Sequence, residues 1–334
     1  MLFRSPPVFY GVVKISVRPF AWYDLPALMK NRSRLVCLNK NQLLTHGNPL
    51  GFAALVLRLK PSAESFTAVV ESAQSVPVMF SQVLHSSGER SARLNFVICQ
   101  KSGDERDVME AWDYLCGKAG EMGALNVLAQ LEEYDPLFDS LRKAGFNVYG
   151  WESSWKLPDK ITAQPLEESK WLIAKPTDVT HMRSLYQSLV PPIVQAAENF
   201  ANGNTRRLLY RENGEILAYV ESVDGPAGLI LKPLIHPAVK DLSALLTDLA
   251  AQFTGIGQTI YLQVRSYQAW LLETLEAIGG ESTAQFSLLV KHLAIMQRNG
   301  VIINNHKRVE HRHAEPTTPI VNNLVTDDPP VINK

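Results

Sequence analysis

Few side chains in this 334-residue sequence are arranged for nucleophilic or metal chemistry. Cys99 ends a predicted strand and could act as a nucleophile, but the sequence places no histidine beside it, and a buried small residue is the alternative interpretation. His236 stands alone at another predicted strand end, where a structural role is more common. The spacing of His306, His311 and His313 predicts incidental metal affinity at best. We therefore predict no metal site, and the sequence contains no Ser-His-Asp or P-loop pattern.

A further group of titratable side chains forms an acidic turn at 132–134, directly after the apolar run 127–131 that predicts a buried strand. Carboxylates and a phenol at a strand end can exchange protons with a bound molecule. A solvated acidic turn is the alternative interpretation. The helix that follows is sharply specified, because Asp135 is a preferred N-cap, Pro136 suits the first helical position and Gly145 suits the left-handed C′ position.

The composition is that of a soluble globular protein, with 46% hydrophobic and 20% charged residues and a net charge of zero. A neutral chain lacks the basic surface that attracts nucleic acids or anionic membranes, so we expect neither as a partner. Three cysteines without a pairing pattern favour a reducing, cytoplasmic location. No apolar run approaches the ~20 residues of a membrane span, and the N-terminus lacks signal-peptide features. The length favours two domains, in a monomer or a homodimer.

The predicted elements occur twice in a similar order. In the first half, we expect strands at 12–17, 66–70, 76–84, 92–99, 127–131 and 149–157, short helices opened by Asp24 and Asp135, and a long helix at 108–122. In the second half, we expect strands at 171–174, 208–211, 216–223, 229–235, 260–264 and 284–293, with helices at 177–189, 242–253 and 269–277. The segment 34–57 is expected to form one or two helices broken at 47–49.

A shift of 134 residues superposes the two halves, because it places Gly145 on Gly279 and Leu141 on Leu275. Two copies of one α+β unit explain this match. The expected organisation is an N-terminal domain at 1–157, a linker at 158–169, a C-terminal domain at 170–298 and a disordered tail at 299–334. The linker and the tail are polar and proline-bearing, and neither has an apolar periodicity.

In each half, a strand closed by a basic residue and a proline precedes a helix opened by aspartate, and a later helix ends in a leucine-to-glycine turn. These motifs are Arg18-Pro19, Asp24 and 141–146 in the first half, and Lys175-Pro176, Asp178, the Asn213-Gly214 hairpin and 275–280 in the second. The pattern resembles the GNAT (GCN5-related N-acetyltransferase) superfamily in a tandem two-domain form. The resemblance implies an α+β fold with α/β/α layers, in which each domain has a mixed, mostly antiparallel sheet flanked by helices.

The resemblance also implies acetyl-CoA as the co-substrate. In this family, acyl-CoA lies in a V-shaped gap between the fourth and fifth strands, and its pyrophosphate rests on the N-terminus of the following helix. In the first half, this places Phe96, Val97 and Ile98 at the gap, with Arg106 and Ala111 in the pyrophosphate turn. A methionine replaces the key glycine of that turn.

The family's general-acid position holds Leu141 in the first half and Leu275 in the second. The resemblance leaves Tyr134 as the nearest substitute acid, with Glu132 and Glu133 as candidate bases for an amine. We therefore expect an N-acyltransferase that moves an acetyl group to a small-molecule or peptide amine. The alternative is a catalytically degenerate GNAT-fold module that binds a metabolite or a protein partner, which the missing glycines and tyrosines favour.

Overall fold

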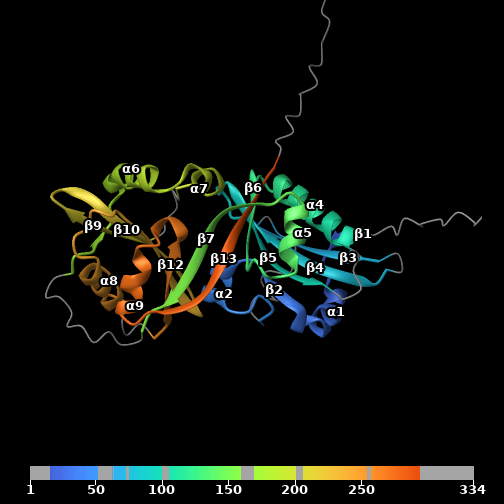
Figure 1. Cartoon of the computed structure of the whole chain (residues 1–334). Helices are drawn as coiled ribbons and strands as arrows, with labels where there is room; N and C mark the ends of the chain where they lie inside the picture. Colours follow the sequence, from blue (N-terminus) through green and yellow to red (C-terminus); the bar gives the residue numbers. More distant parts are fainter. Residues whose placement is uncertain are drawn as a thin grey trace, which may run out of the picture. The chain divides into compact units, whose positions relative to one another are not determined.

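The structure is a computed structural model of the chain (Figure 1), and its described residues are 16–51, 62, 64–72, 75–99, 105–158, 169–200, 206–253 and 257–293. The side chains of residues 105–107 are not described. The described residues belong to one compact unit. The predicted disordered tail, most of the predicted linker and most of the first predicted strand fall outside the described residues.

The first half supplies seven of the described strands. These are β1 (Ser16–Pro19), β2 (Leu35–Cys37), β3 (Ser65–Glu71), β4 (Pro77–Leu84), β5 (Ser91–Cys99), β6 (Asn126–Leu131) and β7 (Asn147–Lys156). The helices are α1 (Leu25–Lys30), α2 (Lys40–His46), α4 (Glu105–Glu121) and α5 (Leu137–Lys143), with 3-10 turns η1 (Trp22–Asp24) and η2 (Arg32–Arg34). The three-strand meander and the long helix confirm the prediction. The segment expected to be wholly helical instead contains the strand β2 before the helix α2.

The second half supplies the remaining described elements. Its strands are β8 (Leu172–Ile173), β9 (Arg207–Glu212), β10 (Glu215–Gly225), β11 (Gly228–Ile235), β12 (Thr259–Arg265) and β13 (Glu281–His292). Its helices are α6 (Val179–Leu189), α7 (Pro192–Ala197), α8 (Leu242–Ala251) and α9 (Leu271–Ala277), with 3-10 turns η3 (Pro176–Asp178) and η4 (Ser266–Gln268). The β9–β10 hairpin turns at Asn213 and Gly214, both with positive φ, as predicted.

The last strands of the two halves are exchanged. β7 pairs antiparallel with β12 of the second half, and β13 pairs antiparallel with β6 of the first half. β7 and β13 also pair with each other, so that the described strands form one continuous sheet. Figure 1 shows β7 and β13 running side by side in the middle of that sheet. The boundaries predicted for the two domains stay a prediction, and the strand pairing crosses them.

Helices cover both faces of the sheet in each half. In the first half, α4 and α5 pack on one face around Trp112 and Leu141, and α1 packs on the other against Phe80 and Phe96. In the second half, α8 and α9 cover one face, and α6 and α7 cover the other. Among the described strands, parallel pairing joins β5 to β6 and β11 to β12, and the other pairs are antiparallel. These layers confirm the predicted α+β fold.

The helices α5 and α9 end in the way that the repeat predicts. Gly145 and Gly279 have φ angles of 87° and 86°, in the left-handed region. The Phe146 amide donates to the Leu141 carbonyl at 3.0 Å, and the equivalent bond after α9 measures 2.8 Å. A left-handed C′ residue followed by this long-range bond satisfies a carbonyl that the helix leaves free. Both helix ends are therefore specified locally.

The two aspartates predicted to open helices behave differently. Asp135 accepts a hydrogen bond from the Leu137 amide at 2.9 Å and caps α5 as predicted. Asp24 lies inside η1, and its carboxylate accepts from the Ala21 amide at 2.8 Å. It also accepts two hydrogen bonds from the Arg18 guanidinium, both at 2.7 Å. The expected cap at Asp24 is therefore wrong for α1, because its carboxylate binds groups that precede it.

The close approach of α2 to the end of β10 requires a glycine. An added Cβ at Gly225 would overlap the Thr45 carbonyl oxygen and lie 2.8 Å from its carbonyl carbon. Gly225→Ala is expected to lower the free energy of unfolding by about 1–3 kcal/mol, as measured by urea titration. Gly117→Ala is the control, because no neighbour lies within 4 Å of an added Cβ there. In the control, the free energy of unfolding should rise by about 0.5–1 kcal/mol. An equal change in both variants would contradict the close contact between residue 225 and Thr45.

Candidate functional site

The carboxyl ends of β5 and β6 diverge, and the chain itself fills the gap between them. β6 pairs with residues 91–93 of β5, and beyond that point β2 pairs with Phe96–Ile98. Leu38 then bridges the two strands. Its amide donates to the Asn95 carbonyl at 2.8 Å, and its carbonyl accepts from the Gln130 amide at 2.9 Å. Main-chain atoms therefore occupy the first-half gap.

The predicted acyl-CoA contacts lie along this occupied edge. Phe96, Val97 and Ile98 are fully buried, and their strand is hydrogen-bonded to β4 on one side and β2 on the other. Arg106 lies in the first turn of α4. Ala111 is fully buried further along that helix, where its amide belongs to the helix's own ladder. Acyl-CoA binding at these five residues stays a prediction, and it would require β2 to leave β5.

The three predicted catalytic residues of the acidic turn have different environments. Tyr134 is 98% exposed, and Glu132 is exposed as well. Glu133 accepts hydrogen bonds from the Trp151 indole Nε1 at 2.7 Å and from the Ser287 hydroxyl at 2.9 Å. These bonds lower the pKa of the Glu133 carboxyl below its ordinary value. Glu133 therefore orients Trp151, and a catalytic role for the three residues stays a prediction.

The cysteines are free thiols in largely buried positions. Burial raises the pKa of Cys99 to about 11 and that of Cys116 to about 12, and it raises the pKa of Cys37 as well. These thiols are therefore protonated near neutral pH and are poor nucleophiles. Within the described part of the chain, no group of three or more His, Cys, Asp or Glu side chains could hold a metal ion. The three tail histidines lie outside it.

The second half repeats the divergence, and here side chains occupy the gap. β12 pairs in parallel with residues 228–231 of β11, after which the strands separate. The Gln268 side chain then covers the β11 edge, because it donates to the Pro233 carbonyl and accepts from the Ile235 amide, both at 2.9 Å. The following helix, α8, is preceded by its N-cap residue Asp241, whose carboxylate accepts a hydrogen bond from the first-turn amide of Ala244 at 2.9 Å. A carboxylate thus already occupies the anion-binding start of this helix.

Arg265, at the carboxyl end of β12, is the centre of a buried ionic cluster. Its Nε lies 2.9 Å from Oε2 of Glu152 on β7, and its Nη2 donates to both oxygens of Glu198, at 2.8 and 3.0 Å. The Tyr149 hydroxyl also donates to Glu198. Glu152 is 1% exposed and accepts a further hydrogen bond from Gln130 Nε2 at 3.0 Å. The side chains of Arg265, Glu152 and Glu198 therefore carry full charges that are paired with one another within the fold.

Two more basic side chains act on the same carboxylates. Arg93 of β5 and Lys232 of β11 contribute to the field at Glu198. Burial would raise the pKa of Glu198, but the charges of Arg265 and Arg93 and the Tyr149 hydrogen bond lower it to about 2. Burial, reinforced by the Arg93 charge, lowers the pKa of Lys232. We call Arg93, Glu152, Glu198, Lys232 and Arg265 the Arg265 cluster.

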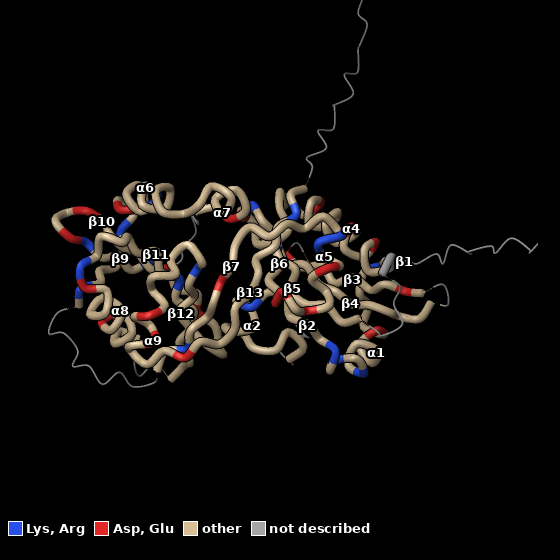
Figure 2. Tube along the Cα trace, viewed as in Figure 1, with Lys and Arg blue, Asp and Glu red and all other residues tan. Residues whose placement is uncertain are grey.

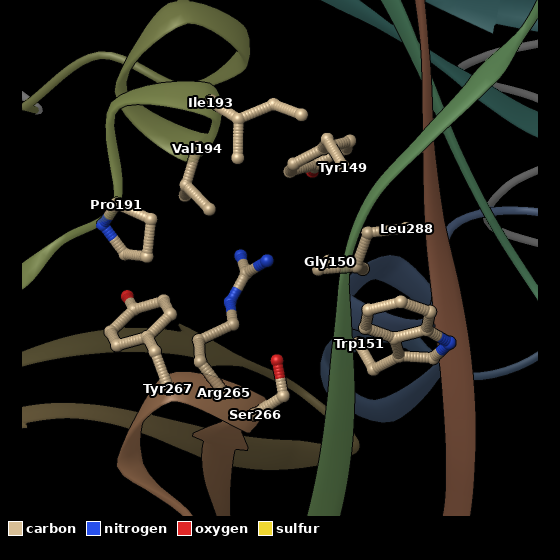
Figure 3. A pocket seen from close by; sticks show the side chains of 10 residues that line it. All are labelled: Tyr149, Gly150, Trp151, Pro191, Ile193, Val194, Arg265, Ser266, Tyr267 and Leu288. Carbon is tan, nitrogen blue, oxygen red and sulfur yellow. The ribbon is translucent and has the colours of Figure 1, made fainter.

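A cavity of about 200 Å³ opens beside Arg265 (Figure 3). Its lining comes from β7, α7, the end of β12 with η4, and β13. The lining residues are Tyr149, Gly150, Trp151, Pro191, Ile193, Val194, Arg265, Ser266, Tyr267 and Leu288. Figure 3 shows the Arg265 guanidinium pointing into the space between Val194 and Gly150. Aromatic and aliphatic walls therefore surround one guanidinium.

Comparison with known proteins gives structural likenesses at low sequence identity. The sequence matches no family model and no curated protein. Among solved structures, it is similar to a GCN5-related N-acetyltransferase from Sphaerobacter thermophilus, with 11% identity, a TM-score of 0.47, and coverage of 83% of this chain and 95% of that one. A tandem GNAT protein from the clavulanic acid biosynthesis pathway has 13% identity, a TM-score of 0.46, and coverage of 84% and 98%.

The order of elements in the chain itself decides the fold. In each half, a short strand and a helix precede a three-strand meander, a helix, a strand parallel to the end of the meander, another helix and a final strand. The two parallel strands diverge at their ends in both halves. This chain has a tandem GNAT-like fold. The resemblance drawn from the sequence is confirmed for the fold. Among the described elements, a second helix precedes the meander in each half (α2 and α7), and β2 is found in the first half alone.

Residues of both charge signs are spread along the chain of the tandem GNAT-like fold. Figure 2 shows basic and acidic residues interspersed along the described trace, in agreement with the net charge of zero. None of the described helices is both long enough and apolar enough to cross a membrane. Neither feature marks a particular binding surface.

Sequence reasoning missed the central residues of this site. The alternation in β7 places Glu152 on the polar side of its strand, which is normally the solvent side. Arg265 directly follows the predicted strand 260–264, and Glu198 lies in the stretch between the predicted elements 177–189 and 208–211, so no pattern marks either side chain. A usable signal was Lys232, which interrupts the apolar run 229–235. A charge inside a strand that is otherwise apolar must find a partner in the interior, so this lysine indicates a buried ionic cluster.

Acid is expected to destabilise the tandem GNAT-like fold through Glu198. Its folded pKa of about 2 lies below the ordinary value of 4.5, so ionised Glu198 stabilises the folded chain above about pH 4.5. This contribution is lost as the pH falls toward 2, with a slope of up to about 1.4 kcal/mol per pH unit. In urea titrations between about pH 4.5 and pH 2, the free energy of unfolding should fall less steeply with pH for Glu198→Gln than for the wild type. Parallel curves for the two proteins would contradict the lowered pKa.

Proposed function

We propose that this chain is a GNAT-fold binding module that holds a small metabolite in the cavity beside Arg265. One observation carries the proposal: the chain itself occupies both strand gaps. β2 and Leu38 fill the first-half gap, and Gln268 with the Arg265 cluster occupies the second. The cavity at the end of β12 stays open, and it contains a polar anchor.

The size of the cavity supports a small ligand. Its volume of about 200 Å³ is below the roughly 300–1,000 Å³ of sites for drug-sized molecules. A cavity of about 150 Å³ holds benzene, so this one holds a ring-sized body with a small substituent. Acyl-CoA is much larger and would also need the β5 edge, where β2 pairs, or the start of α8, where the Asp241 carboxylate caps the helix.

Acyl transfer is the second candidate function, in which acetyl-CoA would donate an acetyl group to the amine of a small molecule or peptide. The divergence of β11 and β12 favours it, because the GNAT family holds its acyl donor between the equivalent strands. The group that covers the β11 edge is a side chain, Gln268, whose rotation would free that edge. Opening the first-half gap would require the main chain of β2 to move. This candidate therefore uses the second half.

Calorimetric titration of the full chain with acetyl-CoA and with CoA separates the two functions. The binding-module proposal expects no heat of binding at millimolar ligand, and no release of CoA when a panel of amines is added. The same chain should be stabilised by a small-molecule ligand, by about 2.7 kcal/mol at a ligand concentration of a hundred times the Kd.

The variant Gln268→Ala tests whether the Gln268 side chain alone blocks the gap between β11 and β12. If the variant gains acetyl-CoA binding that the wild type lacks, the Gln268 side chain is what closes the gap, and the binding-module proposal stands for the wild type. Acetyl-CoA binding by the wild type, with CoA release to an amine, would overturn the proposal in favour of acyl transfer.

A further inference from the structure

We propose that the ligand of this cavity is a neutral ring compound with one uncharged polar group, of which benzyl alcohol is a simple example. This inference rests on the proposed function of the cavity and adds the chemical class of the ligand. Three features of the lining support it: the apolar walls, a charged side chain whose nitrogens are not available to a ligand, and two adjacent hydroxyl groups.

The first feature is the apolar character of the walls (Figure 3). The aromatic and aliphatic side chains come from β7, the start of α7, η4 and β13, and they are Tyr149, Trp151, Tyr267, Pro191, Ile193, Val194 and Leu288. The polar ends of two rings are already in use, because the Tyr149 hydroxyl donates to Glu198 and the Trp151 indole donates to Glu133 at 2.7 Å. These bonds fix both rings before a ligand arrives, and their remaining surface suits another ring.

The second feature is the state of Arg265, the one charged side chain among the ten described residues that line the cavity. Its guanidinium points toward the cavity, but Nε lies 2.9 Å from Glu152 and Nη2 donates to Glu198 at 2.8 and 3.0 Å. Nη1 is fully buried, so a ligand in the cavity does not reach it. An anion would find no free guanidinium nitrogen, and a cation would find no carboxylate among the lining residues. Burying a charge without a partner is costly, so a neutral ligand is favoured.

The third feature is a pair of hydroxyl groups that directly follow β12. Ser266 and Tyr267 are consecutive residues of η4, and both line the cavity. Figure 3 shows the Ser266 hydroxyl pointing into the space beside Arg265. Neither hydroxyl has a hydrogen-bond partner within the described part of the chain. Burial raises the pKa of Tyr267 to about 12, so its hydroxyl stays protonated near neutral pH. Both groups can therefore donate to, or accept from, one uncharged polar group of a ligand.

Calorimetric titration of the full chain with four compounds that share one ring tests the class of ligand. Toluene has no polar group, and benzyl alcohol has a neutral one. Benzylamine is a cation and benzoate an anion near neutral pH. We expect benzyl alcohol to bind at least about tenfold more tightly than either ion, and about two- to tenfold more tightly than toluene.

The outcomes separate this inference from the function on which it rests. If an ion binds as tightly as benzyl alcohol, the neutral class is wrong, although the cavity still holds a small molecule as the proposed function requires. Equal affinities for toluene and benzyl alcohol would contradict the role of the polar group. If none of the four compounds binds at millimolar concentration, the inference and the proposed function fail together.

The double variant Ser266→Ala with Tyr267→Phe removes the two hydroxyl groups and keeps the apolar walls. Benzyl alcohol should bind about two- to tenfold more weakly to this variant, because it loses a hydrogen bond. Toluene is the control, since it makes no such bond and its affinity should stay the same. An equal loss for both compounds would indicate a change in the shape of the cavity and would contradict the role of these hydroxyl groups.

A substitution at an exposed wall residue tests the location of the ligand without disturbing the core. Ile193 is 55% exposed and lines the cavity, whereas Ile173 of β8 is 66% exposed and lies outside the lining. Ile193→Trp should fill part of the cavity and weaken the binding of toluene and benzyl alcohol by about tenfold or more. Ile173→Trp is the matched control and should leave both affinities unchanged, with circular dichroism verifying that both variants are folded. Equal responses to the two substitutions would place the ligand elsewhere and overturn the inference.

Discussion

A chain that ends at Leu157 is expected to be unfolded on its own, although it contains every element of the first copy. In that fragment β6 loses its partner β13, and β7 loses both β12 and β13. Leu289 of β13, which is fully buried in the first-half core, is missing as well. The loss is comparable with the whole stability of a domain, about 5–15 kcal/mol. Circular dichroism and urea titration of residues 1–157, beside residues 1–295, measure it.

Two controls make this result specific to the exchanged strands. Fragments 1–157 and 169–295 should associate when co-expressed and regain a cooperative transition, because each supplies the strand that the other lacks. In the full chain, Leu289→Ala should cost about 2–5 kcal/mol and lower the stability of both halves in one transition. A monomeric 1–157 fragment with its own sharp unfolding transition would contradict the exchange.

Glu152→Ala is expected to lower the free energy of unfolding by about 3–5 kcal/mol, the second large effect. The Glu152 side chain is buried on a central strand, where it lies beside Arg265 and accepts from Gln130. Alanine would leave the guanidinium with a single acidic partner, Glu198, and would leave the Gln130 amide unpaired. Removing one member of a buried pair is costly because the other charge stays out of water. Urea titration near neutral pH measures the loss.

Matched variants separate burial from charge in this prediction. Glu152→Gln keeps an acceptor oxygen and the side-chain volume, so its loss should be smaller than that of alanine. Glu121→Ala removes an exposed partner of Lys118 and should change stability by no more than about 0.5 kcal/mol. If Glu152→Ala were as mild as Glu121→Ala, the Arg265 cluster would have to be hydrated.

Local signals were sufficient for most of the elements, and the order of these elements indicated the fold. The glycine at 145, the cap at Asp135 and the Asn213-Gly214 turn each act through their own backbone geometry, so their effects can be predicted without tertiary information. The exchange of β7 and β13 could not be predicted in this way. An alternating pattern specifies a strand and its buried face, but similar patterns in the two copies leave the choice of partner strand open.

The same limit applies to the pairing that fills the first-half gap and to the Arg265 cluster. β2 has three residues, and its pairing with β5 depends on residues about 60 positions away, so its pattern is too short to distinguish it from a helix. Glu152, Glu198 and Arg265 come from three separate segments, and their charges meet only in the folded chain. The acidic turn 132–134 could be recognised from the sequence because its residues are adjacent. Adjacency in the sequence, however, does not predict whether a side chain is buried in the folded chain.

The pairing of β13 with β6 also determines when the first half can finish folding during synthesis. Leu289 pairs with Ala129, which the ribosome adds 160 residues earlier. At about 5–20 residues per second, roughly 8–32 s pass between the appearance of these two residues. During that interval, β6 presents an unpaired edge, which other nascent chains can join. Chaperones that shield strand edges should therefore raise the yield of this protein more than that of a chain with two separately closed sheets.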